Sequence, residues 1–183
     1  DIFISDNGKS LEKNVFLSNK IHVFDNKNVG GAGGFTRGLI EILRSVSSGN
    51  PITHVLLMDD DILLDPEVLV RTYVLLSLLK REYKDAVIGG SMLRSDKQNI
   101  QVESGAIWNS GKLVSLKAGL DMSKSHACVY NEIEEYCEYN AWWYCCIPMD
   151  VVHESNLPLP IFRRGDDVEY GLRNKKKLIL LNG

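Results

Sequence analysis

The sequence predicts an α/β fold in which a mainly parallel sheet is covered by helices on both faces. Short apolar segments typical of strands alternate with segments whose apolar residues recur at helical spacing. Alternation in units of this length is typical of parallel strands connected by helices. At 183 residues, without an internal repeat or a linker, the chain is expected to form a single domain.

The first half of the chain supplies most of this pattern. Four of its segments are expected to be strands: residues 1–5, 21–24, 55–58 and 86–90. Residues 33–47 carry an apolar stripe at helical spacing. A second helix is expected at 66–81, with Asp65 as its N-cap and Pro66 in its first turn. Because this helix is apolar on most sides, we expect the sheet or a partner to cover it.

The second half is less regular. Short strands with a turn at 109–111 are expected within 100–116, and a loop is expected at 120–131. Residues 136–148 are rich in aromatic side chains and cysteine. A helix at 167–174 and a final strand at 178–181 complete the predicted fold.

Composition and charge exclude several classes of protein. The formal net charge of −3 argues against a nucleic-acid binder, which normally carries a basic surplus. No apolar run approaches the roughly 18 residues of a membrane span, and no secretory signal is present. The basic cluster at 173–177 is expected to be a solvated helix end, with a phosphate-binding or membrane-surface patch as the alternative. Four cysteines are expected to be reduced, buried thiols: Cys128, Cys137, Cys145 and Cys146.

Three adjacent carboxylates, Asp59-Asp60-Asp61, follow the apolar segment 55–58. Like charges repel one another and fill a core poorly, so their emergence together at the end of a buried strand is informative. A divalent cation would neutralise them, since Mg²⁺ and Mn²⁺ prefer hard oxygen ligands and often carry substrate phosphates as well. The run therefore predicts metal-assisted chemistry on a phosphorylated substrate.

A glycine-rich segment at 28–34 (NVGGAGG) separates a predicted strand from a predicted helix. It matches neither the P-loop nor the Rossmann spacing. One interpretation is a tight turn for close packing. The other is contact with a nucleotide diphosphate through Asn28, Gly30 and Gly31, since glycine admits a ligand closely and a helix N-terminus favours an anion. Asp6, on the same predicted sheet edge, is either a turn residue or an acceptor of hydrogen bonds from the nucleotide.

Two further pairs have alternative interpretations. Asp166 can cap a helix that begins at Asp167, with Glu169 completing a capping box, and Asp167 can at the same time serve as a base. Trp142 and Trp143 either form a core cluster or act as platforms for sugars. Neighbouring side chains of a strand point to opposite faces, so both are seldom buried in one core.

An ordered set of motifs resembles family 2 glycosyltransferases of the GT-A fold, and most of all the bacterial galactofuranosyltransferases. The motifs are DNG at 6–8, NVGGAGGF at 28–35, MDDD at 58–61, WW at 142–143 and RGDDVEYGLR at 164–173. The match covers nearly the whole chain. It implies one catalytic domain with a Rossmann-like nucleotide-binding half at 1–95 and a mixed acceptor-binding half at 96–183.

For the donor, the resemblance implies that Asp59 and Asp61 flank a Mn²⁺ or Mg²⁺ ion that bridges the diphosphate. Asp60 would lie near the donor sugar or ribose. The best single expectation for the donor is UDP-galactofuranose.

For the acceptor, the resemblance implies that Asp167 is the general base, that Asp166 positions the acceptor, and that Trp142 and Trp143 line its pocket. A base without a separate nucleophile indicates a single displacement with inversion. The expected acceptor is a glycan or lipid-linked glycan of the cell surface, at the cytoplasmic face of the membrane. Peripheral membrane association and a homo-oligomer are compatible with this expectation.

The chain departs from the family pattern at both ends. Family members usually begin with an earlier strand and place a metal-binding histidine shortly after the last strand. This chain starts at what resembles the second strand and stops at Asn182-Gly183, and none of its four histidines matches that position. We therefore expect a truncated catalytic domain that binds donor weakly and lacks the third metal ligand.

Two alternatives remain from the sequence. A nucleotidyltransferase also combines a glycine-rich loop with aspartate-bound Mg²⁺, but needs a cation for the triphosphate, for which Arg37 is the candidate. A non-catalytic sugar- or nucleotide-binding domain is the other alternative.

Overall fold

The structure, a computed structural model, describes residues 1–182. The chain forms two compact units. Unit 1 consists of residues 1–53 and 149–173, and unit 2 consists of residues 54–148 and the chain from 174 onward. The chain returns to unit 1 after its central segment. The predicted nucleotide-binding half at 1–95 and acceptor-binding half at 96–183 stay predictions.

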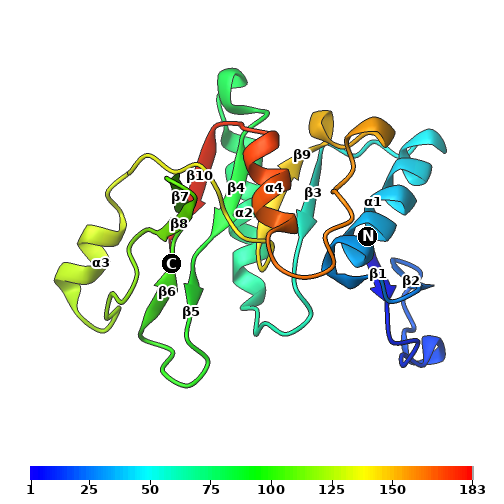
Figure 1. The fold of residues 1–183 in the computed structure, drawn as a ribbon, viewed down its shortest axis with the longest axis horizontal. Helices are drawn as coiled ribbons and strands as arrows, with labels where there is room; N and C mark the ends of the chain where they lie inside the picture. The colour runs from blue at the N-terminus through cyan, green and yellow to red at the C-terminus, as the bar shows by residue number, and fades with distance from the viewer. Residues whose placement is uncertain (183) are drawn as a thin grey trace. The chain divides into compact units, whose positions relative to one another are not determined.

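Unit 1 is built on two parallel strands and two helices. The strands are β1 (Ile2–Asp6) and β2 (Ile21–Asp25), paired so that Ile2 lies opposite Ile21 and Asp6 opposite Asp25. Helix α1 (Gly30–Ser47) follows β2 and lies beside β1, with Ala32, Leu39 and Ile42 buried (Figure 1). The remaining elements are η1 (Lys13–Val15), η3 (Met149–Val151), η4 (Glu154–Asn156) and α4 (Asp166–Arg173).

Unit 2 is organised around a four-stranded mixed sheet in the order β10-β4-β9-β3. These strands are β3 (His54–Leu57), β4 (Val87–Gly90), β9 (Cys145–Pro148) and β10 (Leu178–Leu181). The other elements are α2 (Pro66–Leu78), η2 (Arg81–Tyr83), β5 (Met92–Leu93), β6 (Gln101–Glu103), β7 (Ala106–Asn109), β8 (Lys112–Ser115) and α3 (Ser125–Asn131).

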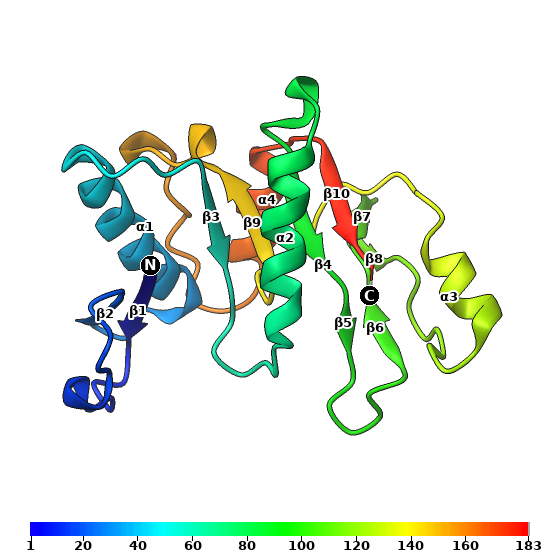
Figure 2. The same ribbon diagram turned by 180° about the vertical axis from the view of Figure 1, so that it is seen from behind.

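Helix α2 covers one face of this sheet (Figure 2). Ala86, Ile88 and Cys146 form the centre of the core. Around it pack partly buried residues of the strands, α2 and η2: Leu56, Leu75, Leu76, Leu79, Tyr83, Ile179 and Leu181. The predicted N-cap is confirmed, because the Asp65 carboxylate accepts the Glu67 N–H at 3.0 Å.

The prediction of a mainly parallel sheet with helices on both faces is not confirmed. β10 pairs with β4 in parallel, but β9 lies antiparallel between β4 and β3. The two hairpin-like pairs, β5 with β6 and β7 with β8, are also antiparallel. The architecture is α/β with small, mixed sheets.

One local prediction is wrong: the segment 120–131 is not wholly a loop, because α3 occupies its second half. Within the described chain the sheet covers only part of the apolar surface of α2, and exposed residues remain at Leu69, Val70, Tyr73, Val74 and Leu78. The helix is therefore held to its unit by a single face. Coverage of these residues by a partner stays a prediction.

All four cysteines are free thiols, as predicted, but only Cys145 and Cys146 are buried, and Cys128 is exposed. Burial raises the pKa of Cys146 to about 12, so this thiol stays protonated at neutral pH. No helix within residues 1–182 combines the length and apolar character needed to cross a bilayer.

The basic cluster at 173–177 is largely paired with carboxylates. Lys175 lies 2.5 Å from Glu138, and Lys176 lies 3.2 Å from Asp85. Arg173 pairs with Glu169. Three of the four cations in the cluster thus have a carboxylate partner.

Glu138 ties several segments of unit 2 together. Its carboxylate accepts hydrogen bonds from Lys175 at 2.5 Å, the Trp108 N–H at 2.8 Å and the Tyr136 hydroxyl at 3.0 Å. The bond from Lys175, supported by the other two, lowers the pKa of Glu138 from 4.5 to about 2. Because the folded-state pKa is the lower one, the stabilisation is complete above about pH 4.5 and is lost as the pH falls toward 2.

We therefore predict a pH-dependent cost for Glu138→Gln. The melting temperature of the variant should lie below that of the wild type by a constant amount above pH 5. This gap should shrink as the pH falls from about 4.5 toward 2. Thermal melts followed by circular dichroism provide the measurement, with the exposed Glu134→Gln as control. A gap of the same size at every pH would show that the ionised carboxylate of Glu138 is not the source of the stabilisation.

Candidate functional site

The predicted site residues belong to both units. Unit 1 holds Asp6, Asn28, Gly30, Gly31, Asp166 and Asp167, and unit 2 holds Asp59, Asp60, Asp61, Trp142 and Trp143. Each set is therefore considered within its own unit.

The acidic run lies just after β3, in the turn that leads to α2. Asp59 is half-buried, whereas Asp60 and Asp61 are exposed. The two exposed carboxylates are accessible hard oxygen donors, so their chemistry fits Mg²⁺ or Mn²⁺. Across residues 1–182 no three His, Cys, Asp or Glu side chains gather into a metal-ligand set. The described residues thus offer the acidic run itself as the candidate metal ligands, and metal binding there stays a prediction.

The carboxylate of Asp6 is buried and organises the loop after β1. One oxygen accepts the Gly8 N–H at 3.1 Å and the other accepts the Leu11 N–H at 2.9 Å. This is the turn chemistry expected of an Asp-Asn-Gly sequence. Contact of Asp6 with a nucleotide stays a prediction.

Asparagine side chains hold the ends of β1 and β2 against the start of α1. The Asn26 amide donates to Asn7 Oδ1 at 2.9 Å and to the Gly33 carbonyl at 3.3 Å. The Gly30 N–H donates to Asn28 Oδ1 at 3.3 Å. These hydrogen bonds hold the first turn of α1. They also give the Gly30 N–H, which has no partner within the helix, an acceptor in Asn28.

Gly30 allows α1 to approach the segment before α4. Its φ of +83° is a conformation that L side chains rarely adopt. A Cβ atom at this position would lie 2.1 Å from the carbonyl oxygen of Phe162. The close-packing interpretation of the glycine-rich segment is therefore supported at Gly30, while contact of Gly30 and Gly31 with a nucleotide stays a prediction.

The acidic pair lies at the start of α4, and this helix begins one residue earlier than predicted. The helix begins at Asp166, and the Val168 N–H is bonded to Asp167 Oδ1 at 2.8 Å. The predicted capping box is wrong, because the Glu169 carboxylate turns toward Arg173 instead of back to the helix start. Asp166 is buried, with 9% of its surface exposed.

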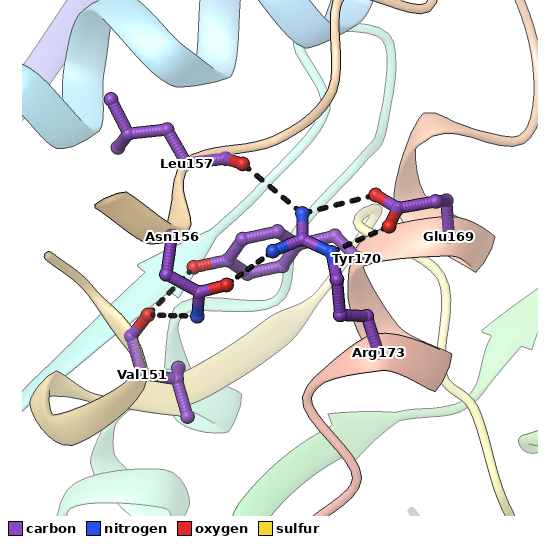
Figure 3. Close-up of polar contacts among 6 residues, drawn as sticks. All are labelled: Val151, Asn156, Leu157, Glu169, Tyr170 and Arg173. Carbon is purple, nitrogen blue, oxygen red and sulfur yellow. Dashed lines mark hydrogen bonds and ion pairs between the residues drawn. The ribbon is translucent and has the colours of Figure 1, made fainter. Parts of the chain in front are cut away.

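Arg173, at the end of α4, anchors the helix to the segment 149–157 (Figure 3). Its guanidinium holds Glu169 through two bonds, of 2.5 and 3.1 Å. It also donates to the side-chain oxygen of Asn156 and, at 3.1 Å, to the Leu157 carbonyl. It lies 5.2 Å from the centre of the Tyr170 ring, at cation–π distance. Hydrogen bonding to Glu169 raises the pKa of Arg173 further above its ordinary range.

Tyr170 adds a second, buried anchor. Its hydroxyl donates to the Val151 carbonyl at 3.1 Å, and the same carbonyl accepts the Asn156 amide at 2.8 Å (Figure 3). Burial raises the pKa of Tyr170 to about 12, so it remains a neutral donor. Neither anchor was assigned from the sequence, although the i, i+4 spacing of Glu169 and Arg173 is a usable signal.

The two tryptophans lie in the turn before β9, not on a strand. Trp142 is only 3% exposed, so its ring is not an open platform for a sugar. Trp143 is half-buried, and its indole N–H donates to the Gly90 carbonyl at 3.1 Å. Of the pair, Trp143 retains the accessible surface that acceptor contact would need.

Comparison with known proteins finds two similar proteins, both named galactofuranosyltransferase. The galactofuranosyltransferase GlfT2 of Mycobacterium tuberculosis (strain ATCC 25618 / H37Rv) is 30% identical over 174 residues, which cover 86% of this chain and 25% of that protein. The GlfT2 of Mycolicibacterium smegmatis (strain ATCC 700084 / mc(2)155) is 26% identical over 192 residues, covering 94% of this chain and 29% of that protein. The chain thus spans about a quarter of the length of these curated relatives. No protein-family model matches it.

The anchoring of α4 predicts that Arg173 cannot be replaced by lysine without loss. A single ammonium cannot hold Glu169, Asn156 and Leu157 together or stack on Tyr170. Because the side chain is about a third exposed, we expect Arg173→Lys to lower the free energy of unfolding by only about 1 kcal/mol. Urea unfolding measures it, with Arg81→Lys as the matched change at another exposed arginine. Equal stabilities of the two variants would show that α4 is held by other contacts.

Proposed function

We propose that this chain is part of a metal-dependent, inverting glycosyltransferase of family 2 with a GT-A fold. It transfers a sugar, galactofuranose being the best candidate, from a UDP-sugar to a hydroxyl group of a cell-surface glycan. The observation that carries the proposal is the similarity to two proteins named galactofuranosyltransferase over most of this chain. The order of its acidic, glycine-rich and aromatic motifs supports it.

In the proposed reaction Asp167 is the general base. Its carboxylate takes the proton from the acceptor hydroxyl while that oxygen bonds to the anomeric carbon. The bond from the anomeric carbon to the diphosphate breaks, and its electron pair leaves with the nucleoside diphosphate. The hydrogen bond from the Val168 N–H to Oδ1 of Asp167 orients this carboxylate. A single displacement of this kind inverts the anomeric centre.

Asp59 and Asp61 would hold Mn²⁺ or Mg²⁺, which when bound neutralises the charge of the leaving diphosphate. Asp60 would lie near the donor sugar or ribose, and Asp6, Asn28, Gly30 and Gly31 would contribute to the nucleotide contact. These residues bring carboxylates and backbone donors of the kinds that such a ligand requires.

On the acceptor side, Asp166 would orient the attacking hydroxyl. Trp143, with its accessible indole surface, is the stronger candidate for contact with the acceptor sugar, and the buried Trp142 is the weaker one. The acceptor would be a glycan or lipid-linked glycan reached at the cytoplasmic face of the membrane. Peripheral membrane association and a homo-oligomer are compatible with that role.

The nucleotidyltransferase alternative is weakened by the state of Arg37. This side chain lies 2.8 Å from Glu41 and 5.3 Å from the centre of the Phe24 ring. Its charge is thus already compensated within unit 1, whereas a triphosphate needs an uncompensated cation. Release of pyrophosphate would favour this alternative, and release of a nucleoside diphosphate favours the glycosyltransferase.

We predict that Asp167→Asn abolishes sugar transfer while leaving donor binding intact. Removing a general base typically costs roughly 10²- to 10⁴-fold in rate, because the acceptor hydroxyl keeps its proton. Transfer from UDP-galactofuranose to a galactofuranose-containing glycan is measured on the full-length natural protein, and binding of UDP with Mn²⁺ is measured by calorimetry. Asp96→Asn, at an exposed aspartate paired with Arg94, serves as the matched control.

Retained transfer in Asp167→Asn would refute the base assignment. Asp59→Asn and Asp61→Asn supply the second arm, since they should remove the Mn²⁺ dependence of UDP binding. UDP binding that does not respond to Mn²⁺ in the wild type would count against the acidic run as a metal site. Donor binding without any transfer in the wild type would support the non-catalytic alternative.

A further inference from the structure

The first turn of α1 carries four glycines, and three of them face loop backbone or uncharged side chains. A Cβ atom would meet the Phe162 backbone at Gly30, the Val29 side chain at Gly33 and the Asn7 amide at Gly34. At each of these positions the missing side chain leaves room for the chain's own loops.

Gly31 differs, because its neighbour is a carboxylate of the proposed site. A Cβ atom on Gly31 would lie 3.0 Å from Oδ2 of Asp166. Apart from the helix itself, no other heavy atom of the described residues lies within 4 Å of that position. A methyl group at Gly31 would therefore require the Asp166 carboxylate to shift by a few tenths of an ångström.

Asp166 has little freedom to move aside. Its side chain is buried, and it stands on the first turn of a helix of eight residues. The other end of that helix is fixed to the segment 149–157 by Arg173 and Tyr170 (Figure 3). The loop before it is fixed by the contact of Phe162 with Gly30. The carboxylate is thus held from both directions against α1.

The electrostatics of this contact are favourable. The first N–H groups of an α-helix lack partners within the helix and carry a partial positive charge, which stabilises a nearby anion. The anion closest to Gly31 is the protein's own Asp166 carboxylate. A substrate diphosphate at the same spot would meet a like charge at close range.

We propose that Gly31 is a positioning residue, which seats the Asp166 carboxylate against the first turn of α1 so that Asp166 can orient the acceptor. The catalytic part of this inference rests on the proposed glycosyltransferase function, whereas the contact between Gly31 and Asp166 is independent of that function. It assigns the glycine-rich turn to the acceptor side of the reaction, in addition to any contact that it makes with the nucleotide.

The test compares Gly31→Ala with Gly38→Ala. Gly38 lies in the same helix, and a Cβ atom there has nothing within 4 Å. Both changes replace a glycine of α1 by alanine, but only the change at Gly31 brings a Cβ atom against Asp166. We expect Gly31→Ala to lower kcat/KM for the acceptor by roughly 10- to 100-fold, because small displacements of positioned groups cost that much. The loss in kcat/KM should be larger for the acceptor than for the donor, and Gly38→Ala should behave as wild type.

Amide shifts in ¹H–¹⁵N spectra give a readout that needs no activity. Gly31→Ala should shift the amides of residues 165–168, and Gly38→Ala should not. Unshifted amides would overturn the contact, and shifted amides with unchanged acceptor kinetics would overturn the positioning role. A rise in the donor KM with the acceptor KM unchanged would assign Gly31 to the nucleotide instead. If the wild type transfers no sugar, the proposed function fails while the spectra still decide the contact.

Discussion

Unit 1 depends on the close approach of the first turn of α1 to the chain at 162–166. Gly30 makes the approach possible, since a Cβ atom there would overlap the Phe162 carbonyl. The parallel pair β1 and β2 brings α1 to this place, and bonds from Asn26 to Asn7 and to the Gly33 carbonyl hold its first turn. On the other side, Arg173 and Tyr170 hold α4. The acidic pair at the start of α4 owes its position to both restraints.

The sequence predicted most elements of the fold because they are specified locally. The apolar segments at 21–24 and 178–181 became strands, and Asp65 caps α2 as its position before Pro66 indicates. Helix α1 begins at Gly30 and not at residue 33, since tertiary contacts override the low helix propensity of glycine. The predicted mainly parallel arrangement is not confirmed, because the antiparallel placement of β9 between β4 and β3 depends on partners far away in sequence.

The candidate site was predictable in its residue types but not in its supporting contacts. The sequence pointed to Asp166 and Asp167, but it assigned Glu169 to a capping box and Arg173 to a solvated basic cluster. In the structure these two side chains bind each other, and Arg173 reaches η4 from the end of α4. Such a contact joins segments that only the tertiary fold brings together. Likewise, burial of Trp142 depends on a turn where a strand was expected.

Gly31 and Asp166 lie in direct contact, and this contact restrains the acidic pair. The most direct measurement is a double-mutant cycle in urea unfolding with Gly31→Ala, Asp166→Ala and the double variant. Alanine at Gly31 should destabilise the wild-type background and stabilise the Asp166→Ala background, where only the gain in helix propensity remains. The coupling free energy should be at least about 0.5 kcal/mol. Additive effects of the two changes would show that Gly31 does not restrain Asp166.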